Sequence, residues 1–116
     1  MEPPIVFKIS SNDDTFLDFY GPLARTLQGF GTVYTPYPVI PPNARTAVPP
    51  PPEVLVTLKS IKSSSLVRQT MRDYLEGYES RELILDIGDR TLRVVGSSLP
   101  EVTDLMDDLL LKTQRR

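Results

Sequence analysis

The alternation of apolar and polar side chains predicts strands in two parts of the chain. Ile5, Phe7 and Ile9 share one face of a short run that is rich in β-branched and aromatic residues. Residues 83–87 and 91–95 alternate around Gly88-Asp89, and a two-residue loop with glycine is typical of a hairpin. We therefore predict a hairpin over residues 82–95, with these apolar side chains on one face: Leu83, Leu85, Ile87, Leu92 and Val94.

Three segments carry apolar residues at helical spacing. The first covers residues 16–27, where Gly21-Pro22 interrupts the apolar stripe. Because proline is costly inside a helix, this segment forms either two short helices or one helix kinked at Gly21. The second segment covers residues 63–78 and the third covers residues 99–112.

Two further segments complete the expected fold. Residues 30–35 are bounded by glycine and proline and indicate a second strand. Residues 53–60 fit a helix as well as a strand, because Val54 and Leu58 have helical spacing while Val54-Leu55-Val56 is typical of a strand. Together the elements predict one α+β domain over residues 1–116, with a small, mostly antiparallel sheet, a C-terminal β-hairpin and helices packed on one face.

The composition changes sharply between residues 36 and 52. Eight of the twelve prolines lie there, and Arg45 is the only charged side chain. Because proline donates no backbone hydrogen bond, we expect a Pro-rich connector that is extended and partly polyproline II. A connector of this length in so small a domain is unusual and tends to be functional or disordered.

Four residues in or beside this connector form the candidate partner-binding site: Tyr34, Tyr37, Val39 and Ile40. A nearly uncharged segment is poorly solvated at a surface, and proline lowers the entropy that is lost when such a segment becomes ordered. The four side chains either contact another chain or fold back onto the protein's own sheet as an anchor. The sequence leaves both alternatives open.

The composition excludes several kinds of chemistry. Cysteine and histidine are absent, so the chain has no disulfide, no Cys or His metal site, no cysteine nucleophile and no histidine general base. Glu101, Asp104, Asp107 and Asp108 cluster on one predicted helix, but no calcium-binding loop surrounds them, and we expect a solvated helix face. We predict a protein that is not an enzyme, with no catalytic residues, no metal and no cofactor.

Charge and hydropathy indicate which classes of partner and which cellular location to expect. The chain has 13 basic and 15 acidic residues and a net charge of −2, whereas a nucleic-acid binder normally has a basic surplus. No apolar run approaches the roughly 18 residues that span a bilayer, and the N-terminus shows no secretory pattern. We therefore expect a cytoplasmic protein that binds neither nucleic acid nor a membrane.

Several short motifs occur in a recognisable order. They are Glu53-Val54-Leu55-Val56-Thr57-Leu58, then Tyr74-Leu75, then residues 83–94 with Gly88-Asp89-Arg90 at their turn, then the Leu-rich residues 102–110. In this order the chain resembles the effector-associated constant component family of bacterial conflict systems. The resemblance implies a non-catalytic component, encoded beside variable effector enzymes, that acts as an adaptor or scaffold.

The leading hypothesis is therefore a non-catalytic protein-interaction adaptor or scaffold of a bacterial conflict system. Its partner would be a protein, either an effector enzyme or a second copy of the chain. The alternative is an immunity protein that binds and inhibits a toxin enzyme, a role that suits a small acidic single domain.

Overall fold

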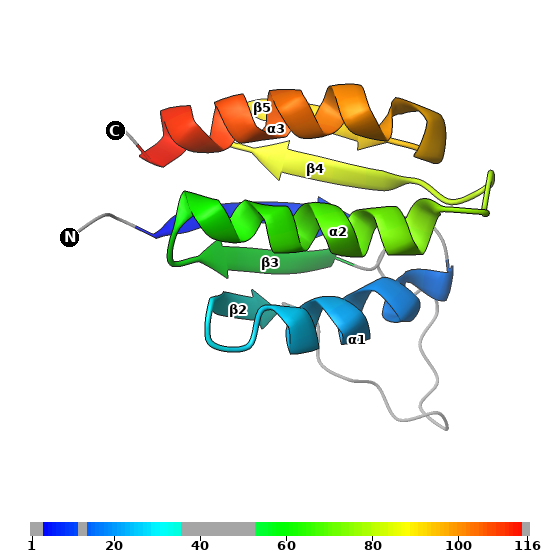
Figure 1. Cartoon of the computed structure of the whole chain (residues 1–116), viewed down its shortest axis with the longest axis horizontal. Helices are drawn as coiled ribbons and strands as arrows, with labels where there is room; N and C mark the ends of the chain where they lie inside the picture. Colours follow the sequence, from blue (N-terminus) through cyan, green and yellow to red (C-terminus); the bar gives the residue numbers. More distant parts are fainter. Residues whose placement is uncertain (1–3, 12–13, 36–52, 115–116) are drawn as a thin grey trace, which may run out of the picture.

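The computed structural model describes residues 4–11, 14–35 and 53–114, which form five strands and three α-helices (Figure 1). The elements, in chain order, are β1 (Ile5–Ser10), α1 (Leu17–Thr26), β2 (Gly31–Tyr34), β3 (Glu53–Leu58), α2 (Ser64–Leu75), β4 (Leu83–Ile87), β5 (Arg90–Val94) and α3 (Leu99–Gln114). A short 3-10 helix precedes each α-helix: η1 (Asp14–Phe16), η2 (Ile61–Ser63) and η3 (Gly96–Ser98).

The five strands form one antiparallel sheet in the order β2-β3-β1-β4-β5. β1 and β2 lie on either side of β3 and are connected through α1, while β3 and β4 lie on either side of β1 and are connected through α2. This arrangement is a pair of interlocked split β-α-β units, the ferredoxin-like order, to which β5 and α3 are added. The first strand of the chain is therefore the central strand of the sheet.

Burial alternates along the strands because one face of the sheet packs against the helices. On β1, for example, Ile5, Phe7 and Ile9 are buried whereas Val6 and Lys8 are exposed. Figure 1 shows the three helices in front of the strands. Their buried apolar side chains complete a continuous core with the strands: Phe19 and Leu23 from α1 with Leu27 at its C-cap, Val67, Met71 and Leu75 from α2, and Met106 and Leu110 from α3.

The α+β class and the antiparallel sheet are confirmed. β4 and β5 pair with the predicted register, since Leu85 lies opposite Leu92. Gly88 has a φ of 61°, the positive value that a type II′ turn requires at the first position of a two-residue loop. α3 follows β5, so a helix and not this hairpin is the last element of the described chain.

Two alternatives that the sequence left open are resolved. Residues 53–58 form a strand and not a helix, because β3 pairs with β1 on one side and with β2 on the other. α1 is one helix that contains Pro22. The proline has no N–H to donate, so one intrahelical hydrogen bond is missing at that turn.

β2 lies close to β3 at Gly31. A Cβ atom at this position would overlap the backbone oxygen of Thr57, so only glycine fits unless one of the strands shifts. The Gly31 N–H also donates to the Leu27 carbonyl (3.0 Å), which ties the start of β2 to the end of α1. The close approach to β3 at Gly31 and the hydrogen bond to Leu27 fix the position of a short strand that ends in Tyr34.

Arg81 fastens the segment between α2 and β4 to the helices. Its side chain is only 11% exposed, and its guanidinium carbon lies 4.6 Å from the ring centre of Tyr74 and 3.6 Å from that of Tyr78. The guanidinium donates to the backbone carbonyl of Tyr74 (2.9 Å) and lies 3.5 Å from the carboxylate of Asp18 on α1. One side chain therefore links α1, the end of α2 and the segment that leads into β4.

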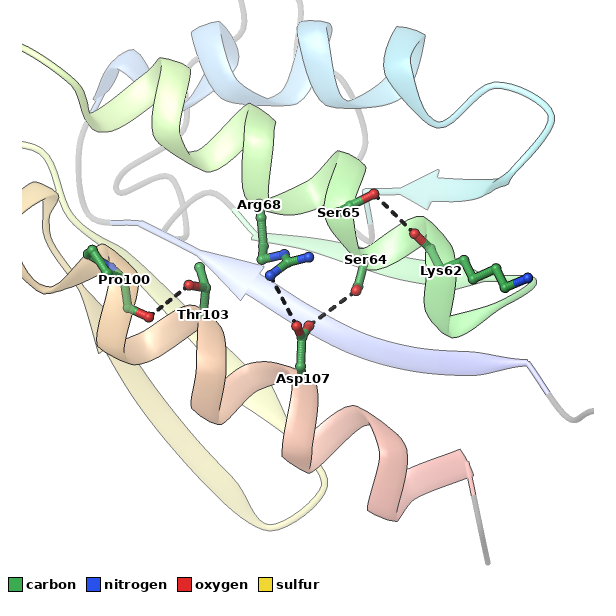
Figure 2. A network of polar contacts seen from close by, with 7 residues as sticks. All are labelled: Lys62, Ser64, Ser65, Arg68, Pro100, Thr103 and Asp107. Atoms are coloured by element: carbon green, nitrogen blue, oxygen red, sulfur yellow. Dashed lines mark hydrogen bonds and ion pairs between the residues drawn. The ribbon is translucent and has the colours of Figure 1, made fainter.

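A polar network joins α2 to α3, as Figure 2 shows. Asp107 on α3 accepts a hydrogen bond from Ser64 Oγ (3.1 Å) and pairs with Arg68 (3.1 Å), and both of these residues lie on α2. The expectation of a solvated acidic face is therefore wrong for Asp107, whose side chain is 30% exposed. The positions of the acidic residues along α3 could not show that a second helix, α2, packs beside Asp107.

Replacing Asp107 with alanine is expected to lower the free energy of unfolding by about 1 kcal/mol, because a charge-assisted hydrogen bond and a partly exposed ion pair are lost together. Urea denaturation measures this change. The matched control is Asp108→Ala on the exposed side of the same helix, which is expected to change stability by less than about 0.5 kcal/mol. A double-mutant cycle with Ser64→Ala that returns no coupling energy would contradict the link between the helices.

Candidate functional site

The side chains that point away from the helices form the open face of the sheet. Residues that lie directly opposite one another on neighbouring strands share a face, because side chains alternate along each strand. The pairing places these side chains in two rows across the open face: Tyr34, Leu55, Lys8, Asp86 and Thr91 in one, and Thr32, Thr57 and Val6 in the other.

Aromatic side chains gather at the β2 edge of the open face. Tyr34 is 62% exposed, and Phe30, in the turn that leads into β2, is 52% exposed. The Phe30 carbonyl accepts a hydrogen bond from the Lys59 N–H (3.1 Å), so the pairing of β2 with β3 continues as far as Phe30. We call Val6, Phe30, Tyr34 and Leu55 the apolar corner.

The apolar corner concentrates exposed apolar area. Three of the six large, exposed apolar side chains that the structure describes belong to it, namely Val6, Phe30 and Tyr34. Leu55 is half-buried and lies between Tyr34 and Lys8 in the pairing of the strands. Apolar residues that are exposed singly are normal, whereas a group of them on one face indicates a contact surface.

Several charged side chains on the open face are paired with one another. The Lys8 ammonium lies 3.7 Å from the Glu53 carboxylate, and the Arg93 guanidinium lies 2.6 Å from the Glu82 carboxylate. β2 itself carries no charged residue. The apolar corner therefore combines aromatic area with a charged border, formed by Lys8 opposite Leu55 and by Lys59 beside Phe30, and protein interfaces likewise have an apolar centre and a polar rim.

The structure describes one of the four predicted binding residues. Tyr34 is exposed at the end of β2, so its side chain is not an anchor buried against the sheet. Tyr37, Val39 and Ile40 lie outside the described residues. Sequence reasoning missed Phe30, although Phe30, Thr32 and Tyr34 have the period of two that places residues on one face of a strand.

The Pro-rich connector joins two strands that already lie side by side. Tyr34 is opposite Leu55, so the end of β2 and the start of β3 lie beside each other. A hairpin of this kind closes with a loop of about two to five residues. The chain instead carries residues 36–52 there, a length that the pairing of the strands does not require, which favours a role other than connection.

A groove between α2 and α3 is a second candidate site. Arg68, Arg72 and Gln69 line it from α2, and Leu99 and Asp104 line it from α3. Charges of both signs are present and Arg68 is already paired with Asp107, so the lining favours no single class of ligand. Within residues 4–11, 14–35 and 53–114, no three acidic side chains are grouped so that they could hold a metal ion.

None of the helices in the described part of the chain has the length and the apolar character needed to cross a bilayer. Comparison with known proteins identifies no family for the chain. No protein-family model matches its sequence, and no curated protein and no solved structure matches it. The candidate site is therefore interpreted from its own geometry.

Proposed function

We propose that the chain is a non-catalytic adaptor that binds a protein partner through the apolar corner. The observation that carries this proposal is the exposure of Tyr34 and Phe30 beside an uncharged edge strand. Aromatic side chains are enriched at the centres of protein interfaces, where a few of them supply most of the binding free energy. Covering them removes apolar area from water, which favours association.

The proposal gives the two faces of the sheet different roles. The helices pack on one face and build the core, and the opposite face is left for the partner. The polar residues next to the apolar corner, Lys8 with its partner Glu53 and then Asp86, form a polar rim on the side of β1 and β4. A rim of this kind excludes water from the centre of an interface and contributes little binding free energy itself.

Nucleic acid fits this surface less well than protein. Proteins that bind single strands stack bases on aromatic side chains within a positively charged groove. Here the central strands offer Val6 and Leu55 instead of aromatic residues, and Lys8 is paired with Glu53. The net charge of −2 adds no long-range attraction for phosphate.

Tyr37, Val39 and Ile40 belong to the proposed surface on grounds of sequence. They follow Tyr34 closely in the chain, in a segment whose only charged residue is Arg45. We propose that they contact the same partner as Tyr34. Their uncharged surroundings match the uncharged strand on which Tyr34 lies.

The resemblance to the effector-associated constant component family supports a setting for this adaptor. In that setting the protein acts in the cytoplasm, beside the effector enzyme of a bacterial conflict system. An immunity protein that inhibits a toxin enzyme is the second candidate, and it differs from the first in the identity of the partner.

Replacing Phe30 and Tyr34 together with alanine is expected to weaken partner binding by at least about tenfold, because both anchors of the interface are removed. The partner is captured from the source cells with the tagged chain, identified by mass spectrometry, and titrated by calorimetry against wild type and variant. Leu111→Ala, which shortens an exposed apolar side chain on α3, is the control and should leave the affinity unchanged. Thermal unfolding of all three proteins is compared in parallel.

Equal affinity of the double variant and the wild type would reject the apolar corner as the binding surface. Lost thermal stability would instead assign these side chains to the fold. Deletion of residues 43–50 tests the connector in the same way, since lost binding with unchanged stability supports its role as a contact. Capture of an effector enzyme supports the adaptor, whereas capture of a toxin that the chain inhibits supports the immunity protein.

A further inference from the structure

β5 and α3 form the edge of the molecule on the side away from β2 (Figure 1). Among the described strands, β5 pairs only with β4. The loop between them has two residues, so Ile87 and Arg90 exchange backbone hydrogen bonds. Hydrogen-bonded pairs alternate with pairs that are not hydrogen-bonded along antiparallel strands, so Leu85 and Leu92 also exchange backbone hydrogen bonds. The backbone N–H and C=O groups of Thr91 and Arg93 therefore point away from β4.

The outward backbone groups of β5 match those of a second β5 in antiparallel orientation. When a two-fold axis passes through Leu92, Thr91 of one copy lies opposite Arg93 of the other. Each such pair exchanges two hydrogen bonds, so the outward groups of both strands are satisfied. The two Leu92 residues then face each other at the axis.

The charges on the open face of the sheet suit this arrangement. Thr91 donates a hydrogen bond to the Asp86 carboxylate (2.8 Å), and Arg93 pairs with Glu82 (2.6 Å). In the two-fold pair, Arg93 comes beside Thr91 of the other copy and so beside Asp86 of that copy. Each arginine then lies between an acid of its own chain and an acid of the second chain, and no like charges lie directly opposite each other.

The helix side of the same edge is apolar. Asp107 faces α2, so Val102, Leu105 and Leu109, on the opposite flank of α3, face the β5 edge. Leu105 is 40% exposed, and Val102, Leu109 and Leu92 are only partly buried. The same axis brings this stripe beside its counterpart in the second copy.

The remaining arginine of β5 meets no like charge in the opposite strand. Arg90 of one copy comes opposite Val94 of the other copy, because the pairing is symmetric about Leu92. Val94 is apolar and buried, so this position adds no repulsion between the two copies.

We propose that the chain forms a symmetric homodimer through β5 and α3, in which two sheets join into one continuous sheet. Arginines on an edge strand normally protect it against pairing with other chains. In this dimer, Asp86 of the second copy offsets Arg93, so the edge selects its own copy over other strands. The interface lies at the opposite edge of the sheet from the apolar corner and does not rest on the proposed function.

A single engineered cysteine tests the pairing, because the chain contains no cysteine. Leu92→Cys places two cysteines at the axis, where opposite residues without mutual hydrogen bonds have Cα atoms about 4.5 Å apart, within reach of a disulfide. Mild oxidation is expected to convert most of this variant into a linked dimer on a non-reducing gel. Arg90→Cys, which lies opposite Val94 and not opposite itself, is expected to stay unlinked.

A second pair of variants tests the backbone hydrogen bonds in solution. Thr91→Pro removes an outward N–H and is expected to weaken dimerisation by about tenfold or more, because that bond occurs twice in the dimer. Thr91→Ala loses the same hydroxyl but keeps the N–H, and should dimerise like the wild type. Light scattering after size-exclusion chromatography over a dilution series measures the mass, and circular dichroism checks that both variants are folded.

Several results would overturn the proposal. A wild-type chain that is monomeric at every concentration excludes the dimer. Equal cross-linking of Leu92→Cys and Arg90→Cys excludes this pairing, and efficient cross-linking of Tyr34→Cys alone moves the contact to the apolar corner. If Thr91→Pro does not fold, the cysteine experiment decides by itself.

Discussion

Replacing Leu85 with alanine is expected to lower the free energy of unfolding by about 2–4 kcal/mol, the cost of removing a buried leucine side chain and leaving a cavity. Leu85 is completely buried, and it lies opposite Ile9 on the central strand β1 and opposite Leu92 on β5. The surrounding side chains belong to three strands of one sheet and have little freedom to move into the space. Urea denaturation monitored by circular dichroism measures the change.

Ile84→Ala is the matched control for this prediction. Ile84 is the preceding residue on β4, half-buried on the open face, and lies opposite Arg93. Its replacement is expected to cost less than about 1.5 kcal/mol, because less apolar area is lost and no closed cavity forms. A loss for Leu85→Ala no larger than that for Ile84→Ala would show that the two faces of the sheet are exchanged.

Replacing Arg81 with alanine is expected to lower the free energy of unfolding by about 2–3 kcal/mol, from the loss of a desolvated cation–π contact and a charge-assisted hydrogen bond. The guanidinium lies 3.6 Å from the ring centre of Tyr78 and donates to the Tyr74 carbonyl. Tyr74 in turn shares a hydrogen bond with Thr15 (3.0 Å), so the loss reaches the start of the α1 segment. Thermal and urea denaturation both report the change.

Two further variants separate the parts of this interaction. Asp18→Ala removes the ion pair alone and is expected to cost less than about 0.5 kcal/mol, since that carboxylate is 67% exposed. Arg81→Lys keeps the charge but loses the planar group that lies over the ring, so it should recover only part of the stability. Full recovery by lysine would mean that charge alone holds the segment between α2 and β4.

A part of the fold could be predicted from the sequence where residues close together in the sequence determine it. The hairpin of β4 and β5 was predicted with its pairing because two residues of loop and a glycine at its first position determine which residues are opposite. Residues 53–58 could not be assigned, since their sequence fits both periods. They form a strand because β1 and β2, distant in sequence, pair with both of their sides.

The candidate site could likewise be predicted only in part, because segments distant in the sequence form it. Tyr34 was predicted as a contact residue from the uncharged segment that follows it, and the structure places it exposed at the end of β2. The other members of the apolar corner could not be grouped with it. Val6 and Leu55 join Tyr34 only through the order of the strands, which places β1 and β3 beside β2. Asp107 was misread for a similar reason, because its partners Ser64 and Arg68 lie on another helix.

The central position of β1 has a consequence for how the protein folds. Ile5 lies opposite Leu58 and Lys8 lies opposite Asp86, so both ladders of this strand join residues far apart in the sequence. β2 with β3, and β4 with β5, are half-sheets that β1 alone connects. Because long loops must close before these contacts form, a topology of high contact order folds more slowly than a helical bundle. The two half-sheets therefore join into one hydrogen-bonded sheet only when β1 inserts between them.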